Sequence, residues 1–116
     1  MAQIKILVVE DEPALAMSYA RIFEKRQAVV LTASDTDTAM ALFRGNPDIT
    51  AVVLDGEVPG SMSTAELAAE FRKSSKCRLV AIVGSLDRSH ELVKLCDASC
   101  QKPFYAADIC KLLGLS

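Results

Sequence analysis

The sequence predicts an α/β domain built on a five-stranded parallel sheet, and two observations support that prediction. Short apolar runs rich in Val, Ile and Leu recur along the 116 residues, and a stretch of helical period follows each of them. Alternation of this kind gives a parallel sheet with right-handed crossovers and helices on both faces. We therefore expect five β-α units, with residues 1–116 forming one domain.

The five apolar runs are expected to form the strands. They lie at residues 4–9, 28–33, 49–54, 79–83 and 98–101, and the last is the weakest. Three of them are nearly continuous Val, Ile, Leu and Ala, with no alternation of apolar and polar residues. This composition is typical of a strand that is covered by helices on both faces.

The first two helices have clear sequence signals. In the first, apolar side chains recur at the i, i+4, i+7 and i+8 spacing of one helix face: Leu15, Tyr19, Ile22 and Phe23. The second reaches Gly45, which is followed by Asn46 and Pro47. A glycine at the C-cap and a proline that stops the helix predict its end there.

The other three helices follow from a cap and from spacing. Ser63 and, three residues later, Glu66 form a capping-box pattern that predicts the start of the third helix. Apolar residues at helical spacing predict a fourth helix over about 88–96 and a fifth over about 106–113.

The composition excludes several classes of protein. Hydrophobic residues make up 51% of the chain, enough for a core without disulfides or metal ions. There are 13 Lys and Arg against 15 Asp and Glu, and this net charge of −2 argues against nucleic-acid binding, which needs a basic surface. The sequence has no apolar run near the roughly 18 residues of a membrane span, and no signal-peptide layout. We expect a cytoplasmic protein that binds neither nucleic acid nor membranes.

The four cysteines are expected to be reduced thiols that pack mostly as small apolar side chains. They are Cys77, Cys96, Cys100 and Cys110. The spacing of Cys96 and Cys100, with His90 as the single histidine of the sequence, does not match a zinc pattern. Nothing in the sequence suggests export, so a disulfide framework is not expected.

Charged residues follow three of the predicted strands at the point where each strand ends. Glu10 and Asp11 come after the first strand, Asp55 after the third and Lys102 after the fifth. Open parallel sheets bind ligands at the carboxyl ends of their strands, so these residues mark the candidate site. If the first and third strands are neighbours, the three carboxylates converge.

Converging carboxylates favour a bound cation, because like charges raise one another's pKa unless a cation relieves them. A hard divalent ion that prefers oxygen ligands, Mg²⁺ or Mn²⁺, is the natural partner. With the ammonium of Lys102 nearby, the site suits phosphoryl chemistry: the metal and the lysine neutralise the phosphoryl group while a carboxylate attacks it. Any one of these clusters alone would fit an ordinary solvated loop.

Three motifs, in this order and spacing, resemble the receiver (phosphoacceptor) domain of two-component response regulators. Residues 6–13, Ile-Leu-Val-Val-Glu-Asp-Glu-Pro, resemble the acidic first-strand motif of that family. Asp55, followed by Pro59 and Gly60, resembles the phosphoacceptor and its loop, and Lys102-Pro103-Phe104 resembles the closing lysine–proline motif. The resemblance covers essentially the whole chain. It implies a flavodoxin-like, doubly wound (βα)5 fold with strand order 2-1-3-4-5 and no output domain.

The resemblance also implies a role for each site residue. Asp55 would accept a phosphoryl group from a sensor histidine kinase or a phosphotransfer protein. Asp11, Asp55 and the backbone carbonyl of Glu57 would hold Mg²⁺ (or Mn²⁺), and Glu10 would act on the metal directly or through water. Lys102 would pair with the phosphoryl oxygens, after a cis peptide bond to Pro103. Such a chain is a signalling phosphoacceptor and not an enzyme, beyond its own phosphorylation and dephosphorylation.

Two positions depart from the family pattern. The family has a Thr or Ser at the end of the fourth strand, where counting along the strand places Gly84; a shift of one residue makes Ser85 the switch hydroxyl, and we favour that interpretation. Ser99 stands three positions before Lys102, where the family often has an aromatic residue that reports phosphorylation. The stretch 85–102 is also short, so the output surface is not expected to be typical.

Alternative functions stay open on the sequence. A degenerate receiver, acting as a phosphorylation-independent interaction module, fits the altered fourth and fifth strands but not the retained Glu10, Asp11, Asp55 and Lys102. A flavodoxin-like electron carrier is disfavoured because acidic residues after the first strand would repel its phosphate. A hydrolase with Asp55 as nucleophile would use Glu57 as a second carboxylate.

Output is expected through contact with an unidentified downstream protein, made by a monomer or a weak dimer. The side chain of Glu57 leaves two possibilities open. Either it faces solvent and only its backbone matters, or its charge alters phosphorylation, metal affinity or hydrolysis.

Overall fold

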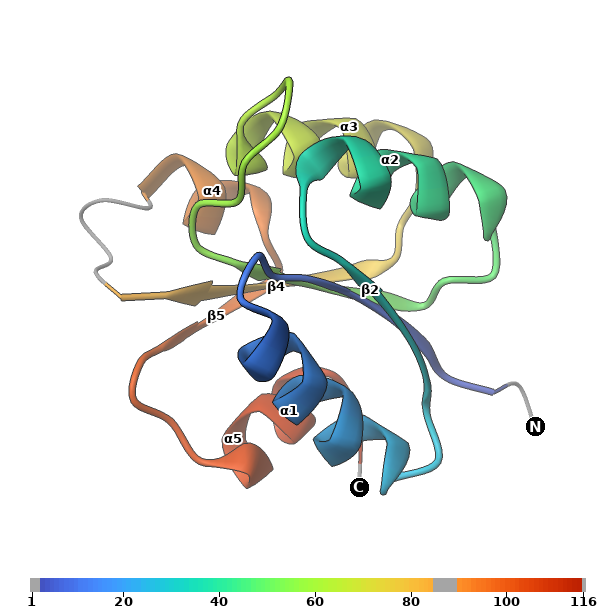
Figure 1. Cartoon of the computed structure of the whole chain (residues 1–116), viewed down its shortest axis with the longest axis vertical. Helices are drawn as coiled ribbons and strands as arrows, with labels where there is room; N and C mark the ends of the chain where they lie inside the picture. Colours follow the sequence, from blue (N-terminus) through green and yellow to red (C-terminus); the bar gives the residue numbers. More distant parts are fainter. Residues whose placement is uncertain (1–2, 85–89, 116) are drawn as a thin grey trace.

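Five parallel strands form the middle layer of the computed structural model, which describes residues 3–84 and 90–115 (Figure 1). They are β1 (Lys5–Val9), β2 (Val29–Ala33), β3 (Ala51–Asp55), β4 (Arg78–Val83) and β5 (Ala98–Gln101). Their order across the sheet is β2-β1-β3-β4-β5, and all neighbouring pairs are parallel. The predicted flavodoxin-like fold and its strand order 2-1-3-4-5 are confirmed.

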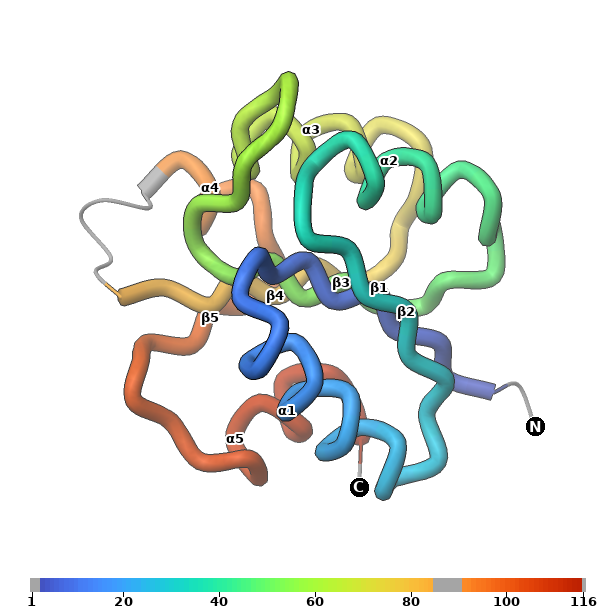
Figure 2. The backbone as a smooth tube through the Cα atoms, in the orientation of Figure 1, coloured from blue at the N-terminus to red at the C-terminus, as the bar shows by residue number. Residues whose placement is uncertain are grey.

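Helices cover both faces of this sheet. Within the described residues they are α1 (Pro13–Glu24), α2 (Thr36–Gly45), α3 (Thr64–Ser74), α4 (His90–Leu95) and α5 (Ala106–Leu112). α1 and α5 lie on one face, and α2, α3 and α4 lie on the other (Figures 1 and 2). The described α4 ends before Cys96, which the prediction included. Over the described ranges, no helix is long and apolar enough to cross a membrane.

The helix ends confirm one predicted cap and correct another. Ser63 Oγ accepts a hydrogen bond from Glu66 N at 3.0 Å, and Glu66 Oε1 accepts one from Ser63 N at 2.9 Å, which confirms the predicted capping box. The predicted glycine cap of α2 is wrong, because Gly45 is the last helical residue and lacks a positive φ. The side-chain amide of Asn46 instead donates to Leu42 O at 2.8 Å, so a left-handed residue is not needed there.

Two apolar layers flank the sheet, because successive strand side chains point to opposite faces. Toward α2, α3 and α4 lie Leu7, Val9, Val52, Leu54, Leu79, Ala81 and Val83, packed with Phe43 and Phe71, whose ring centroids are 4.1 Å apart. Toward α1 and α5 lie Ile6, Val8, Val53, Val80 and Ile82, packed with Tyr19, Phe23 and Ile109. This double burial explains why the central strands read as continuous apolar runs.

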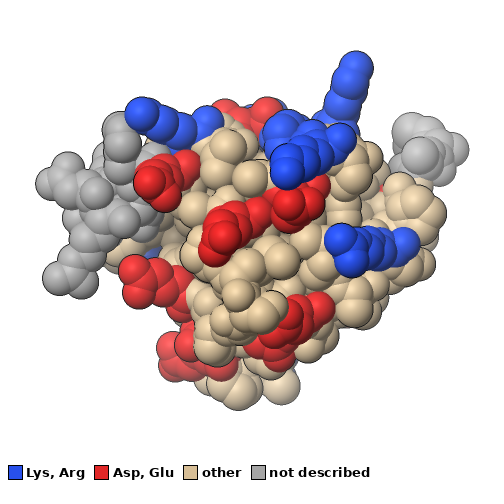
Figure 3. Space-filling view, turned by 90° about the horizontal axis from the view of Figure 1, so that it is seen from above, with Lys and Arg blue, Asp and Glu red and all other residues tan. Residues whose placement is uncertain are grey.

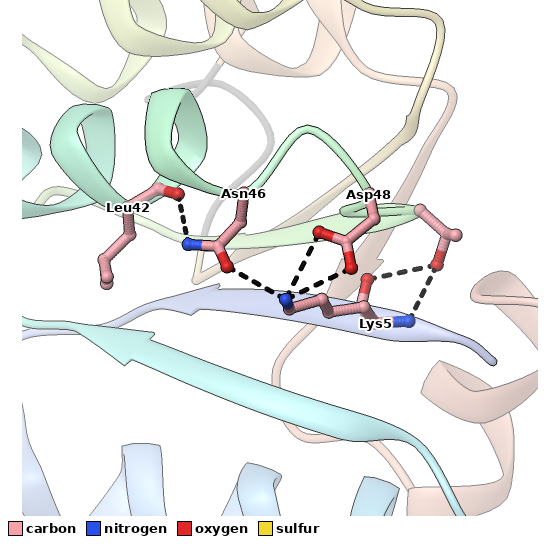
Figure 4. Close-up of polar contacts among 5 residues, drawn as sticks. Lys5, Leu42, Asn46 and Asp48 are labelled. Atoms are coloured by element: carbon pink, nitrogen blue, oxygen red, sulfur yellow. Dashed lines mark hydrogen bonds and ion pairs between the residues drawn. The ribbon is translucent and has the colours of Figure 1, made fainter.

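A polar cluster around Lys5 fastens the connection between α2 and β3 to the amino end of β1 (Figure 4). Lys5 Nζ lies 2.9 Å from Asn46 Oδ1 and 3.2 Å from Asp48 Oδ1. Thr50 Oγ1 accepts from Lys5 N at 3.1 Å and donates to Lys5 O at 3.0 Å. These contacts order the chain where it enters β3.

The four cysteines are free thiols in the structure. Cys77 and Cys110 are buried, and Cys96 and Cys100 are half-buried. Burial raises the pKa of each thiol, to about 12 for Cys96, so all four stay neutral near pH 7. They therefore pack as small apolar side chains.

The face that carries α2 and α3 presents charges of both signs. Seen from above, the Lys and Arg side chains lie mainly in the upper part and at the right of the view, whereas Asp and Glu side chains extend over its middle and lower part (Figure 3). The mixture agrees with the small net charge of the chain, −2. Among the described residues of this face, the field that a partner would meet therefore differs from one part of the surface to another.

The loop between β3 and α3 is anchored on the first turn of α2. Thr36, which is fully buried, donates from its backbone nitrogen to Pro59 O at 2.8 Å and from its hydroxyl to Met62 O at 3.0 Å. Both carboxylate oxygens of Asp37 accept from Ser61, one from its backbone nitrogen at 3.0 Å and the other from its hydroxyl. This loop follows Asp55 directly, so its anchoring fixes the chain beside that carboxylate.

Gly60, in this anchored loop, has no room for a side chain. Its φ is +145°, and a Cβ there would overlap the Thr36 hydroxyl and lie 2.9 Å from the Thr36 backbone nitrogen. We predict that Gly60→Ala lowers the free energy of unfolding by about 2 kcal/mol, measured by urea denaturation. Gly45→Ala is the control, because a Cβ at that helical position meets open space and should be neutral or slightly stabilising. Equal stability of both variants would contradict the prediction.

Candidate functional site

The register of the sheet brings the predicted site residues to one edge. Val9 of β1 is level with Leu54 of β3, and Asp55 of β3 is level with Ile82 of β4. Lys102 follows β5 and donates its backbone N–H to Val83 O at 2.9 Å. Glu10, Asp55 and Lys102 therefore leave three strands at the same edge, as the topology predicted.

Asp55 and Lys102 form an ion pair at this edge. Lys102 Nζ lies 2.9 Å from Asp55 Oδ1. The Asp55 side chain is 6% exposed, whereas that of Lys102 is 40% exposed. The carboxylate is thus buried at the end of β3, and the lysine side chain that balances its charge is partly exposed to solvent. The peptide bond between Lys102 and Pro103 is cis, as the family resemblance implied.

The second oxygen of Asp55 has a partner that the sequence did not indicate. The hydroxyl of Tyr19, on α1, donates to Asp55 Oδ2 at 2.9 Å, and Tyr19 is only 2% exposed. The sequence placed Tyr19 correctly on the buried face of the first helix, but as a core residue. A signal was present: a buried tyrosine, unlike a phenylalanine, needs a polar partner for its hydroxyl.

Glu10 is the other buried carboxylate of the site. Burial, and next the negative charge of Asp55, raise the pKa of Glu10 to about 7. The backbone N–H of Glu12, 3.3 Å from Glu10 Oε1, and the more distant charge of Lys102 oppose this rise. Two buried carboxylates thus share one ammonium, and the site favours additional positive charge.

Asp11 and Glu57 lie at the site's exposed margin, and Asp11 does not join the buried pair. Both residues are exposed to solvent. In residues 3–84 and 90–115, no three acidic, histidine or cysteine side chains lie close enough to hold a metal ion together. The expected convergence of carboxylates is therefore seen for Glu10 and Asp55 only.

The donor chemistry nevertheless fits a hard divalent cation. The buried donors, from Glu10 and Asp55, are carboxylate oxygens, the ligand type that Mg²⁺ prefers. When both are ionised, their negative charge exceeds the single positive charge of Lys102. Burial first, and then the charge of Asp55, raises the pKa of Glu10. Asp11 follows Glu10 directly in the chain, and the backbone of Glu57 lies just beyond Asp55.

The two departures noted in the sequence fall at the ends of β4 and β5. Gly84 is exposed directly after β4, and it brings no hydroxyl to the site. Ser85, the favoured switch hydroxyl, lies outside the described residues. Ser99 is half-buried in β5, level with Ala81 of β4. An aromatic ring is thus absent from this point of the sheet.

Comparison with known proteins agrees with the fold. The family model described as "Response regulator receiver domain" matches residues 6–113. No curated protein sequence matches the chain. Among solved structures, a response regulator receiver domain protein from Clostridium thermocellum is 25% identical, with a TM-score of 0.86, over 96% of this chain and 91% of that chain.

Two further solved structures share the fold. A CheY-like receiver domain from Methylobacillus flagellatus is 21% identical, with a TM-score of 0.83 and coverage of 97% of both chains. A CheY-like receiver domain protein from Methanospirillum hungatei is 23% identical, with a TM-score of 0.85, over 97% of this chain and 91% of that chain. With a family model that spans nearly its whole length, the chain belongs to the response regulator receiver domain family.

Proposed function

We propose that this chain is a Mg²⁺-dependent phosphoacceptor, in which Asp55 takes a phosphoryl group from a sensor histidine kinase or a phosphotransfer protein. The observation that carries the proposal is the 2.9 Å ion pair between buried Asp55 and accessible Lys102. A carboxylate held at the end of a strand, with a cation on its solvent side, is placed to attack an anionic donor.

Receiver domains as a family provide the chemical background. They are phosphoacceptors and not classical enzymes, they generally bind Mg²⁺ at an acidic pocket, and they interact with histidine kinases or phosphotransfer proteins. For this chain, the proposed output is an altered contact with a downstream protein. Because Ser99 replaces the aromatic residue, that output would not depend on an aromatic side chain in β5.

The transfer requires one bond to form and one to break. Asp55 Oδ1 would attack the phosphorus of a phosphohistidine, a new P–O bond would form, and the P–N bond would break. The imidazole keeps the electron pair of that bond and takes a proton from solvent. The ammonium of Lys102, already beside Oδ1, would neutralise charge on the phosphoryl oxygens. Ser85 is proposed as the hydroxyl that contacts the phosphoryl group.

The metal would be held by oxygens of the acidic edge. We assign Asp55, Asp11 and the backbone carbonyl of Glu57 as ligands, with Glu10 acting directly or through water. When bound, Mg²⁺ (or Mn²⁺) would neutralise negative charge that develops on the phosphoryl group. Without the metal ion, the carboxylates of Glu10 and Asp55 repel each other. They also repel the anionic phosphodonor.

The first test is intact-mass analysis after incubation with acetyl phosphate, with and without Mg²⁺. We predict one phosphoryl adduct on the wild type with Mg²⁺, none with excess EDTA, and none on Asp55→Asn, which keeps the shape of the side chain but lacks the nucleophile. An unmodified wild type that is folded and binds Mg²⁺ would contradict the proposal. That result would favour the phosphorylation-independent interaction module.

Mg²⁺ is predicted to stabilise the folded protein. At concentrations well above its dissociation constant, it should raise the free energy of unfolding at pH 8 by about 1–3 kcal/mol, because it binds the folded state only. Thermal unfolding with Mg²⁺ and with EDTA measures the difference. Asp55→Asn should lose most of this gain. Glu57→Gln is the matched control and should keep it, since only the Glu57 carbonyl is assigned as a ligand.

The metal-free protein should show an unusual pH dependence that originates in Glu10. Its pKa of about 7 in the folded state, against 4.5 in the unfolded state, means that the folded state holds more protons between these pH values. The free energy of unfolding should therefore fall, by about 2–3 kcal/mol from this residue, as the pH rises from about 4.5 to about 7.

Glu10→Gln isolates this contribution, because glutamine resembles the protonated acid and does not titrate. Asp37, Glu66 and Asp97 have lowered pKa values and act in the opposite direction, equally in both proteins. Urea denaturation in EDTA from pH 4 to 8 should show the variant gaining stability over the wild type as the pH rises. If the free energies of unfolding of the two proteins changed in parallel with pH, the pKa of Glu10 would not be raised in the folded state.

A further inference from the structure

Tyr19 lies in the site without a role in the chemistry proposed so far. Its hydroxyl donates to Asp55 Oδ2 at 2.9 Å, and the side chain is almost wholly buried on the face of α1 that packs on the sheet. A phenylalanine would fill the same apolar space without the hydroxyl. The contact therefore adds something to Asp55 that packing does not require.

The ring that carries this hydroxyl has two nearly parallel aromatic neighbours. Phe23, one turn further along α1, lies nearly parallel to it, with ring centroids 6.2 Å apart and an interplanar angle of 8°. Phe104, in the segment between β5 and α5, is also nearly parallel, at 6.1 Å and 4°. Because aromatic neighbours restrict the ring, the hydroxyl is presented to Asp55 from a defined direction.

The two oxygens of Asp55 have different partners as a result. Oδ1 pairs with Lys102, whose side chain is 40% exposed, while Oδ2 accepts from the buried Tyr19. The terminal torsion of an aspartate is broad, so an unrestrained carboxylate turns easily. With one oxygen bound on the α1 side, the other is directed toward the accessible side of the site.

We propose that Tyr19 is a positioning residue for phosphoryl acceptance, which holds Asp55 so that Oδ1 faces the phosphodonor. This inference rests on the proposed function. Tyr19 acts through Asp55 and does not itself contact the donor. A carboxylate oxygen has more than one lone pair, so the hydrogen bond leaves Oδ2 able to bind a cation as well.

The test compares Tyr19→Phe with the wild type, using acetyl phosphate and Mg²⁺, with the adduct followed by intact mass. In the reaction Oδ1 forms a P–O bond, the P–O bond to the acetyl group breaks, and acetate leaves. We expect the rate at saturating acetyl phosphate to fall about three- to tenfold, and the half-saturating concentration to stay unchanged. A merely structural loss would not separate these two quantities.

Tyr105→Phe is the matched control. Tyr105 is 82% exposed, so the same removal of a hydroxyl should leave the rate as in the wild type. A spectroscopic readout needs no turnover: the carboxyl carbon resonance of Asp55, assigned by its loss in Asp55→Asn, should shift in Tyr19→Phe and not in Tyr105→Phe.

The results distinguish the positioning role of Tyr19 from the proposed phosphoacceptor function. Equal rates for the wild type and Tyr19→Phe would overturn the positioning role and leave the phosphoacceptor intact. A wild type without any adduct would overturn both. If Tyr19→Phe does not fold, Phe104→Leu replaces it, because it loosens the Tyr19 ring while keeping an apolar side chain. That variant should be about twofold slower, and an unchanged rate would overturn the role.

Discussion

The site depends on the burial of one carboxylate, that of Asp55, at the end of a central strand. A buried charge is costly unless it is paired and hydrogen-bonded, and both conditions are met. Lys102 supplies the opposite charge at Oδ1, and Tyr19 supplies a hydrogen bond at Oδ2. Each partner comes from a different layer of the fold, one from the segment after β5 and one from α1. The carboxylate therefore requires the sheet and its covering helix to be assembled together.

The sheet order is the reason that these groups meet. β1 and β4 both pair with β3, and β5 pairs with β4, so the ends of three strands converge around Asp55. Glu10, placed there by β1, is a second buried acid with its pKa raised to about 7. When Glu10 and Asp55 are both ionised, the positive charge of Lys102 does not fully balance their negative charge. The proposed binding of Mg²⁺, and of a phosphoryl group beside it, rests on that imbalance.

Much of this was predictable from the sequence, because it depends on periodicity and on strand ends. The five β-α units and the capping box at Ser63 follow from local patterns. The strand order was implied by the resemblance to the receiver family, and with that order the ends of parallel strands bring Glu10, Asp55 and Lys102 together. The contacts that were not predicted are side-chain hydrogen bonds that form only once the elements have packed. The hydroxyl of Tyr19 finds Asp55 only after α1 has packed, and Asn46, not Gly45, satisfies the end of α2. Asp11 is exposed, and its expected role as a metal ligand stays a prediction.

The cluster around Lys5 has a consequence for how this molecule tolerates change. It joins β1 to the segment that enters β3, at the end of the sheet opposite to the reactive carboxylate (Figure 4). The path of the chain into β3 is thus set by contacts independent of Asp55, Glu10 and Lys102. The Lys5 cluster and the Asp55 carboxylate thus lie at opposite ends of the strands. A substitution that disturbs the Lys5 cluster would therefore alter how the chain enters β3 while leaving the hydrogen bond and the ion pair of Asp55 in place.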